Sequence, residues 1–460
     1  MGMRMMGMRL AATGVLLQCA MAMQTHAASI TVTNTNDSGP GSLRQALTTA
    51  NDSDTITFAV TGTITLTSGG LPVTKNLTIS GPGADQLSID GNQALLVFGI
   101  FPEKTAAISG LTIRNAEAGV WNEGTLAASN CVFSGNSHGL LNQLGIVTVS
   151  SCVLSGNSYN GLYSEGVSTV SDSVVSGNSY GGLFNDVHHG PNKPAAGYGS
   201  MTIADSIIID NSGSGVLNYG FLTILNSTVS GNSAGQGYDG GGISSGTFKT
   251  PASVTVVNST ISGNSASGAG GGIANYYWSV TIVNSTISGN SAGDAGGAIV
   301  NYAGGVQIAN STLSGNSAAS GGGIDNVGGQ FGGRIETGNT IFNAGASGEN
   351  IFNNGGTITS HGYNVCSDNG GGLLNGPGDQ INTDPLLGPL QDNGGPTFTH
   401  MLLPGSPAID AGDPNFTPPP FRDQRGPCFH RVFSRRIDVG SVEAQPQPRC
   451  VTPGPRPTPH

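Results

Sequence analysis

The stretch Val280–Ser291 reads Val-Thr-Ile-Val-Asn-Ser-Thr-Ile-Ser-Gly-Asn-Ser, and close copies of it recur along the chain. Apolar and polar residues alternate in it with period 2, which is typical of strands, and the 3.6-residue spacing of helices is missing. Its Gly-Asn-Ser ending returns with the following asparagines: Asn136, Asn157, Asn178, Asn232, Asn264, Asn290 and Asn316, with Asn211 in a variant Asp-Asn-Ser. One repeat of 21 to 33 residues cannot bury its apolar side alone, but stacked repeats can. The repeat predicts an all-β fold, a right-handed, single-stranded parallel β-helix.

Two columns of asparagines result when the coils are aligned. A Gly-[Val/Leu/Ile]-x-Asn motif places one column at Asn122, Asn142, Asn185, Asn218, Asn275, Asn301 and Asn326. The Asn-Ser-Thr motif places the other at Asn226, Asn258, Asn284 and Asn310. Stacked amides can each donate to the next oxygen in line, so a buried polar column is satisfied. We therefore expect structural ladders at the turns.

The ends of the chain differ from its repetitive middle. Arg4 and Arg9 precede an apolar run and a small-residue site at Ala27, which is the pattern of a cleavable signal peptide. Ser42 and Gln45 have capping-box spacing and predict a short capping helix. The expected division is a signal peptide at 1–27, a cap and first coils at 28–100, β-helix repeats at 101–359, a less regular C-terminal region at 360–443 and a Pro-rich tail at 444–460. No later segment is apolar enough to span a bilayer, so we expect an exported protein, extracellular or at the cell surface.

Composition excludes some partners. The net charge is -11 and only 9% of residues are charged, with no basic cluster that could follow a phosphate backbone, so nucleic acid is not expected as a partner. Cys131 and Cys152 occupy the same register one coil apart, so they form either a disulfide or a reduced stack of small residues. Cysteine and histidine spacing does not suggest zinc, and no metal site is expected from it.

One outward-facing pattern suggests a ligand. The x position of the Gly-[Val/Leu/Ile]-x-Asn motif reads Trp121, Leu141, Tyr163, Phe184 and Leu217 upward, and two residues further on the chain has Glu123, Gln143, Glu165, Asp186 and Tyr219. Aromatic rings beside carboxylates can hold sugar rings, and His188 and His189 follow in the adjacent loop. Three interpretations stay open: aromatics packed under the 186–199 loop with solvated acids, a glycan surface on Trp121, Tyr163, Phe184, Glu165 and Asp186, or catalysis by Glu123, Glu165 and Asp186. Carboxyls one or two coils apart bracket the separations used by retaining and inverting glycosidases.

A second acidic group lies in the C-terminal region. Asp368, Asp379, Asp384 and Asp392 stand among Asn and Gly residues and could supply oxygen ligands to Ca²⁺. Their spacing is irregular, so structural turns are the other interpretation. No cofactor is otherwise expected.

Several segments resemble known families. Ile30–Ala46 is similar to the opening of many exported bacterial β-helix proteins, and Phe133–Asn136 and Gly296–Ile299 resemble the FxxN and GGAI repeats of polymorphic outer-membrane proteins. Asp384–Thr397 and Gly405–Asp410 resemble the "choice-of-anchor Q" C-terminal region of bacterial surface proteins. The resemblance implies a β-helix followed by a surface-associated region and says little about activity.

Together these features predict an exported scaffold without catalysis, adhesin-like or binding glycan or matrix components. The alternative is a polysaccharide lyase or glycoside hydrolase that uses carboxylates on the β-helix face.

Overall fold

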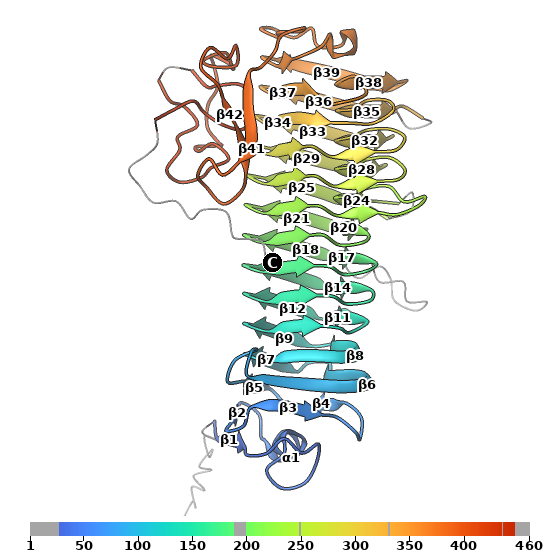
Figure 1. Ribbon diagram of the computed structural model, residues 1–460, viewed down its shortest axis with the longest axis vertical. Coiled ribbons are helices and arrows are strands. Elements are labelled where there is room, and N and C mark those ends of the chain that lie inside the picture. Colours follow the sequence, from blue (N-terminus) through green and yellow to red (C-terminus); the bar gives the residue numbers. More distant parts are fainter. Residues whose placement is uncertain (1–26, 188–198, 248–249, 330–331, 435, 447–460) are drawn as a thin grey trace, which may run out of the picture.

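The computed structural model describes residues 27–187, 199–247, 250–329, 332–434 and 436–446. Nearly all of the predicted signal peptide, the loop residues His188 and His189 and most of the Pro-rich tail lie outside the described residues. In the described part the chain winds into a right-handed parallel β-helix, as predicted (Figure 1). No helix in these ranges is long and apolar enough to cross a membrane.

The first face of the solenoid is a 14-stranded parallel sheet. Equivalent residues pair directly, so Val280 lies between Val254 of the coil below and Val306 of the coil above. All three are no more than 1% exposed, because alternate positions of each strand face the core. The strands, in spatial order, are β1 (Ser29–Val32), β2 (Thr55–Phe58), β5 (Leu77–Ser80), β7 (Thr105–Ser109), β9 (Thr125–Ser129), β12 (Ile146–Ser150), β15 (Val167–Ser171), β18 (Ser200–Ala204), β21 (Phe221–Leu225), β25 (Ser253–Val257), β29 (Ser279–Val283), β33 (Gly305–Ala309), β36 (Arg334–Gly338) and β39 (Thr357–Gly362).

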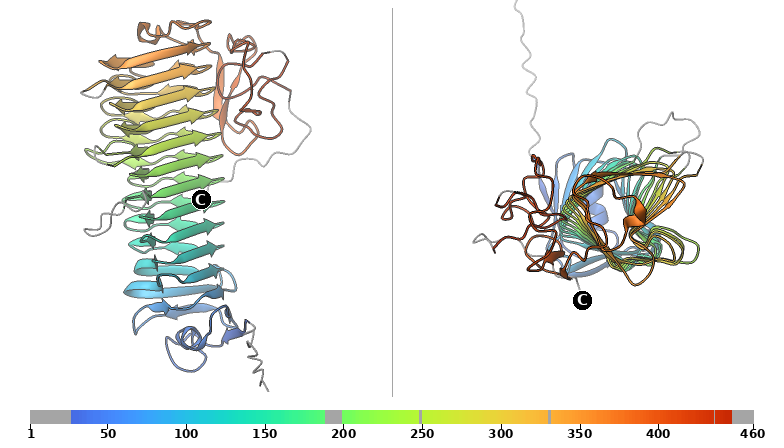
Figure 2. Two further views of the ribbon diagram at one scale, coloured as in Figure 1. Left: turned by 180° about the vertical axis from the view of Figure 1, so that it is seen from behind. Right: turned by 90° about the horizontal axis from the view of Figure 1, so that it is seen from above.

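Two further parallel faces close the cross-section around one apolar core (Figure 2). Two long strands, β6 (Leu87–Ile100) and β8 (Thr112–Asn122), span both faces in the lower coils. The second face contains β3 (Gly62–Thr65), β10 (Val132–Ser134), β13 (Val153–Ser155), β16 (Val174–Ser176), β19 (Ile207–Ile209), β22 (Thr228–Ser230), β26 (Thr260–Ser262), β30 (Thr286–Ser288), β34 (Thr312–Asn316), β37 (Ile341–Ala344) and β40 (Val365–Cys366). The third face contains β4 (Leu71–Val73), β11 (His138–Asn142), β14 (Asn160–Ser164), β17 (Gly181–Asn185), β20 (Ser214–Asn218), β24 (Ile243–Ser245), β28 (Ile273–Tyr276), β32 (Ile299–Tyr302), β35 (Ile324–Val327) and β38 (Ile351–Asn354). Short strands β23 (Ser233–Ala234), β27 (Ser265–Ala266) and β31 (Ser291–Ala292) pair at the corner between these faces.

The Gly-Asn-Ser repeat is the corner between the second and third faces. Its glycine has the left-handed φ that a sharp turn requires, for example 65° at Gly135. Its asparagine points inward, and the asparagines of successive repeats form a hydrogen-bonded ladder. The sequence showed these asparagines as a repeat, but we did not predict the ladder from it. Each Nδ2 donates to the next Oδ1 at 2.8–3.3 Å, from Asn136 up to Asn316. The glycine therefore allows the sharp turn at this corner, and the asparagine bonds the turn to the coils above and below it.

The ladder predicted at the end of the third face is also present. Asn122 donates to Asn142 at 2.7 Å, and Asn275 donates to Asn301 at 2.8 Å. Serines interrupt this ladder at two coils, because Ser164 lies directly below Asn185 and Ser245 directly below Asn275. The Oδ1 atoms of Asn185 and Asn275 are buried and have no hydrogen-bond partner in the described residues. A serine side chain is too short to reach the amide above it. The predicted asparagine ladder is thus confirmed, in three segments.

The other predicted column, at Asn226, Asn258, Asn284 and Asn310, differs from the expectation of a buried ladder. Its members have positive φ, near 50°, and stand at the corner between the first and second faces. Asn284 donates to Asn258 at 2.7 Å, yet Asn226 and Asn258 are half-buried. Asn284 and Asn310 are buried because the C-terminal region covers them, with the Asn284 amide donating to the carbonyl of Arg422.

Cys131 and Cys152 are buried free thiols, so the disulfide interpretation of this pair is wrong and the small-residue stack is present. The backbone N–H of Cys131 points to Cys152 Sγ at 3.4 Å. One coil higher, the N–H of Cys152 donates to Ser173 Oγ at 3.1 Å. The second cysteine thus occupies the acceptor position that serines fill in later coils. Cys428, in the C-terminal region, is disulfide-bonded.

Both ends of the solenoid carry additional structure. Helix α1 (Leu43–Thr49) buries Leu43, Ala46 and Leu47 beneath the first coils, and Ser42 caps it by accepting the N–H of Gln45. The last coil is followed by a 3₁₀ turn at Gly370–Gly372 and an antiparallel pair, β41 (Leu387–Gln391) and β42 (Thr399–Leu402).

The irregular C-terminal region folds back against the second face of the upper coils (Figure 2). Gln424 is fully buried at this contact, where its side chain bonds to Thr286 Oγ1 at 2.6 Å and to Thr260 Oγ1 at 2.9 Å. Behind it, Arg425 pairs with Asp423 at 2.6 Å, and both side chains are wholly buried. The region is therefore bonded to the solenoid over several coils.

Candidate functional site

A groove runs along the third face, where side chains point away from the core. The predicted x column stands on this face: its members lie directly opposite one another on successive strands and are all half-buried, and they are Trp121, Leu141, Tyr163, Phe184 and Leu217, of which Leu217 lines a cavity. One wall follows the end of each strand, and the other follows the Gly-Asn-Ser corner. The pleat of the strands, which alternates inward and outward residues, positions these side chains.

The first wall brings two predicted carboxylates together through a tyrosine. Tyr163 Oη lies 2.7 Å from Asp186 Oδ2 and 3.0 Å from Glu165 Oε1. Burial, and then the hydrogen bond to Asp186, raise the pKa of Tyr163 above its ordinary value, so the phenol keeps its proton at neutral pH. The other oxygen of Asp186 accepts the N–H of Val187 at 2.8 Å, which fixes the orientation of the carboxylate.

The aromatic rings of this wall and the x column touch. Phe184 makes edge contacts with Tyr163 and Tyr219, with centroids 5.0 and 5.3 Å apart. Burial first, and then the charge of Asp186, raise the pKa of Tyr219. Trp121 lies two coils below Tyr163 in the same column, and Glu123 beside it is exposed. The structure therefore groups Tyr163, Phe184, Glu165 and Asp186, with Trp121 and Glu123 at the lower end.

The opposite wall was not found from the sequence. Tyr159 and Tyr180 follow the Gly-Asn-Ser motif in successive coils and are 51% and 50% exposed, with rings 6.0 Å apart. Below them the His138 ring stacks on Tyr159 at 5.3 Å. Burial lowers the pKa of His138 despite the charge of Glu117 nearby, which favours the neutral ring. The sequence did contain a signal for this wall, since His138, Tyr159 and Tyr180 each stand two positions after an asparagine of the Gly-Asn-Ser ladder.

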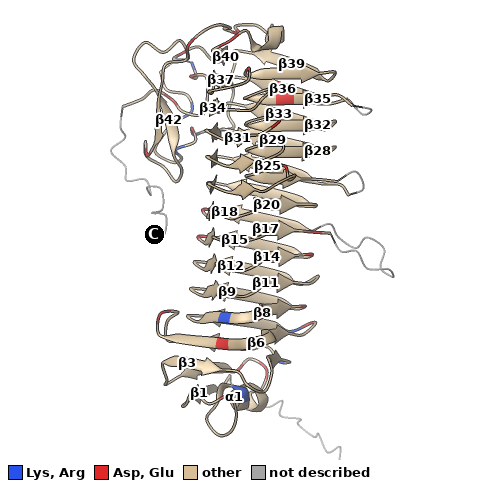
Figure 3. Cartoon of the chain, turned by 45° about the vertical axis from the view of Figure 1, so that its right-hand side comes forward, with Lys and Arg blue, Asp and Glu red and all other residues tan. Residues whose placement is uncertain are grey.

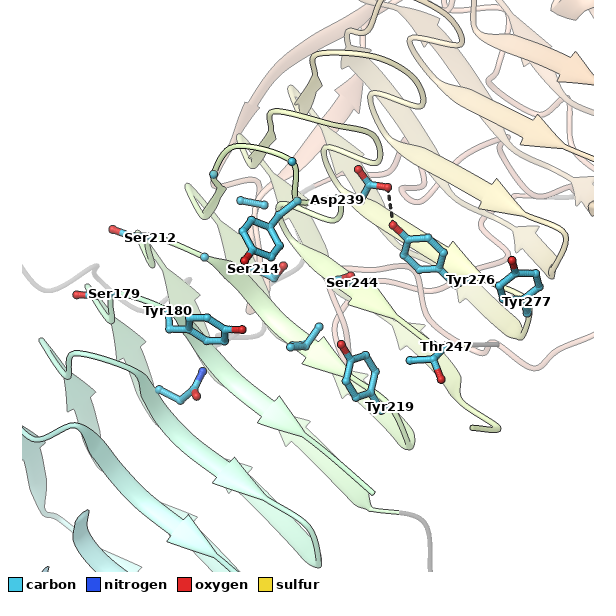
Figure 4. A pocket seen from close by; sticks show the side chains of 18 residues that line it. Ser179, Tyr180, Ser212, Ser214, Tyr219, Asp239, Ser244, Thr247, Tyr276 and Tyr277 are labelled. Carbon is cyan, nitrogen blue, oxygen red and sulfur yellow. Dashed lines mark hydrogen bonds between the residues drawn. The ribbon is translucent and has the colours of Figure 1, made fainter. Parts of the chain in front are cut away.

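An upper cavity of about 550 Å³ opens between the walls (Figure 4). It is lined by five tyrosines: Tyr180, Tyr219, Tyr238, Tyr276 and Tyr277. An inserted loop brings Asp239 over the cavity, where its Oδ2 accepts the Tyr276 hydroxyl at 2.5 Å and its Oδ1 accepts the N–H of Ala269. Burial, and then this hydrogen bond, raise the pKa of Tyr276, so its hydroxyl also stays protonated.

A lower cavity of about 710 Å³ lies at the Gly-Asn-Ser corner of lower coils. Tyr159 lines the lower cavity and Tyr180 the upper, and these two rings are neighbours. Glu117, Asn136 and His138 supply its polar lining. The two cavities therefore follow each other along the corner between the second and third faces, an arrangement that suits a linear ligand better than a compact one.

The carboxylates of the four C-terminal aspartates accept backbone N–H groups. The carboxylate of Asp368 accepts the N–H groups of Asn350 and Gly370, and that of Asp379 accepts the N–H of Asn364. Asp384 and Asp392 each accept an N–H two residues ahead, as in Asx turns. In the described ranges, no group of three or more His, Cys, Asp or Glu side chains is placed to hold a metal ion. The interpretation as structural turns fits these contacts.

No protein-family model and no curated protein matches this chain. Among solved structures it is similar to a pectate lyase, with 17% identity over 91% of this chain and 96% of that one and a TM-score of 0.44. It is also similar to the A-module of a mannuronan C-5 epimerase from Azotobacter vinelandii, with 14% identity over 71% and 91% and a TM-score of 0.42. A third is the catalytic unit of an α-1,3-glucanase from Streptomyces thermodiastaticus, with 14% identity over 70% and 68% and a TM-score of 0.39. Because all three scores lie below 0.5, the function is inferred from the residues of the groove alone.

Proposed function

We propose that the protein binds an extended polysaccharide along the groove of its third face. The observation that carries this proposal is the aromatic lining of two cavities in neighbouring coils: His138 and Tyr159 line the lower one, and Tyr180 and Tyr219 are among the tyrosines that line the upper one. Aromatic faces cover the C–H surfaces of sugar rings, while the neighbouring carboxylates accept hydrogen bonds from sugar hydroxyls. Cavities that follow each other over several coils match a polymer of several sugar units.

We also propose that the protein is exported from the cytoplasm. The N-terminal signal pattern and the disulfide-bonded Cys428 both support an oxidising compartment outside the cytoplasm. An adhesin-like or matrix role at the cell surface rests on the family resemblance of the C-terminal region and stays a prediction.

A binding experiment tests the proposal. The full chain is screened on a polysaccharide array, and Kd for the best ligand is measured for the wild type and for Tyr180→Ala, which removes a half-exposed ring. Loss of one stacking contact of about 1.4 kcal/mol weakens Kd about tenfold. Phe421→Ala is the matched control, because Phe421 is 69% exposed on the C-terminal region, away from the groove. Absence of any bound polysaccharide, or equal Kd values for both variants, would refute the proposal.

A second candidate is cleavage of the bound polysaccharide by Glu165 and Asp186. The observation that favours it is their shared contact with Tyr163 Oη: the two contacting oxygens are no more than about 6 Å apart, closer to the spacing of retaining than of inverting glycosidases. The test is release of reducing ends from each bound polysaccharide. Glu165→Gln should abolish turnover and leave binding largely intact. Absence of turnover by the wild type would remove this candidate and leave the binding proposal standing.

A further inference from the structure

The outward x column of the third face continues above the upper cavity, on strands that lie directly over one another (Figure 3). At the cavity its members are half-buried, as at Leu217 and Ser244, which line the cavity. On the next three strands, β28, β32 and β35, the same position is buried: Ala274 and Val300 are 0% exposed, and Asp325 is 3% exposed. The face is therefore covered directly above the cavity.

The cover is formed where the two walls of the cavity come together. Ala269, on the corner side, packs with Ala274 and Val300 in one apolar cluster. Tyr276 and Tyr302, which stand two residues after the x position, pack against the same cluster, and their rings stack at 5.2 Å. The two walls therefore meet over β28 and β32 instead of standing on either side of an open face.

Glycines allow the corner to lie directly on the strand in these coils. Gly270 has a φ of 70°, and a Cβ there would lie 2.9 Å from the Cα and Cβ of Ala274. The equivalent Gly296 has a φ of 65°, and a Cβ there would lie 2.6 Å from the backbone N of Val300. Only glycine fits so close an approach with such a φ, and no room is left for a ligand over these two strands.

Asp239 joins the two walls at the top of the cavity. Its Oδ2 accepts the Tyr276 hydroxyl from one wall, and its Oδ1 accepts the N–H of Ala269 from the other (Figure 4). The Tyr276 ring lines the cavity and is supported from behind by Tyr302, which does not line it. The upper cavity therefore ends at a wall that is packed and hydrogen-bonded.

We propose that the upper cavity receives the terminal sugar of a polysaccharide chain, and that the rest of the chain extends toward the lower coils. This inference rests on the proposed function and specifies which part of the polymer is recognised. Three covered coils at about 4.8 Å each span about 14 Å along the axis, so an internal segment would have to bend away from the face to pass them. A chain end stops at Tyr276. Toward the lower coils the x column stays half-buried from Leu217 to Trp121, so the face is not covered in that direction.

A comparison of chain lengths on the wild-type protein tests this inference. The polysaccharide with the lowest Kd in the array is separated into two preparations that differ about tenfold in mean chain length, both long enough to fill the two cavities. A site for chain ends binds each chain once, whereas internal segments offer many sites per chain. Calorimetry should therefore give the same Kd per mole of chains for both preparations, and the short one should half-saturate the protein at about tenfold lower mass concentration. Half-saturation at equal mass concentration would overturn the inference and leave a polysaccharide site. Absence of binding by either preparation would instead refute the proposed function.

Asp239 is a positioning residue in this proposal, because it holds Tyr276 and the corner together. Asp239→Ala removes both hydrogen bonds and should weaken Kd per mole of chains about tenfold. Asp239→Asn is the matched variant, since its amide can accept the N–H of Ala269 and donate to the Tyr276 hydroxyl, and it should keep Kd within about twofold. An unchanged Kd in Asp239→Ala, or equal losses in both variants, would overturn this role.

Discussion

Replacing one asparagine of the Gly-Asn-Ser ladder should destabilise the solenoid far more than its small size suggests. Asn264 lies in the middle of this ladder and is fully buried. Its side chain makes four hydrogen bonds: it accepts the backbone N–H and the amide of Asn232 at 3.0 and 2.9 Å, and it donates to the Val229 carbonyl and to Asn290 Oδ1, both at 2.9 Å. Asn264→Ala removes all four and leaves their partners buried.

The magnitude follows from these partners. A typical hydrogen bond contributes about 1 kcal/mol net, and a buried group left without a partner costs about 1–3 kcal/mol, so we expect a loss of about 3–5 kcal/mol. Ser265→Ala is the control in the next position. Among the residues that the structure describes, the Ser265 hydroxyl bonds only to Ser233 Oγ at the surface, so this variant should change stability by less than about 0.5 kcal/mol.

The assay is urea denaturation followed by circular dichroism, with hydrogen exchange to locate the damage. Because each coil pairs directly with the coils above and below it, exchange should rise first in the coils that contain Asn232, Asn264 and Asn290. A loss below about 1 kcal/mol, or a loss equal to that of Ser265→Ala, would refute the claim that the ladder stabilises the corner.

Three further predictions follow from the described contacts. Because Cys131 and Cys152 are reduced, protein unfolded without a reductant should be alkylated at both, and mass spectrometry finding them linked would contradict the structure. Burial raises the pKa of Glu443 from 4.5 to about 9, so between these pH values the folded protein keeps a proton on Glu443 that the unfolded chain releases. The contribution of this proton to the free energy of unfolding should be complete below pH 4.5 and lost as pH rises to about 9. Glu443→Gln should flatten that part of a plot of Tm against pH, and an unchanged slope would count against it. Gln424→Ala removes the buried bond to Thr286, so limited proteolysis should cut the C-terminal region faster while the coils stay resistant, and an unchanged cutting rate would argue against this docking contact.

Much of the fold was predictable because the coil is a local unit repeated many times. The period-2 strands and the Gly-Asn-Ser corners identify the solenoid, and the aligned registers place Tyr163 beside Phe184 on one outward face, with Glu165 and Asp186 two residues after them. The division of the chain into its parts, and the choice-of-anchor resemblance, stay predictions.

What the sequence did not reveal depends on contacts between distant segments. Asp239 reaches Tyr276 across 37 residues through an inserted loop of irregular length, so no repeat register predicts their bond. Gln424 reaches Thr286 across 138 residues. The disulfide alternative for Cys131 and Cys152 failed for a different reason, because the register brings the cysteines close but also makes the upper one a hydrogen-bond acceptor for the lower backbone.

The corner asparagines also constrain how such a rod can change in length. Asn136, Asn157 and Asn178 are separated by 21 residues each, and each amide needs its counterpart one winding away. Inserting or deleting part of a coil would leave asparagine amides of both ladders without partners. Inserting or deleting a whole coil adds or removes complete sets of these hydrogen bonds. Gain or loss of segments therefore proceeds in complete windings, and the span available to a bound polymer grows or shrinks in the same steps.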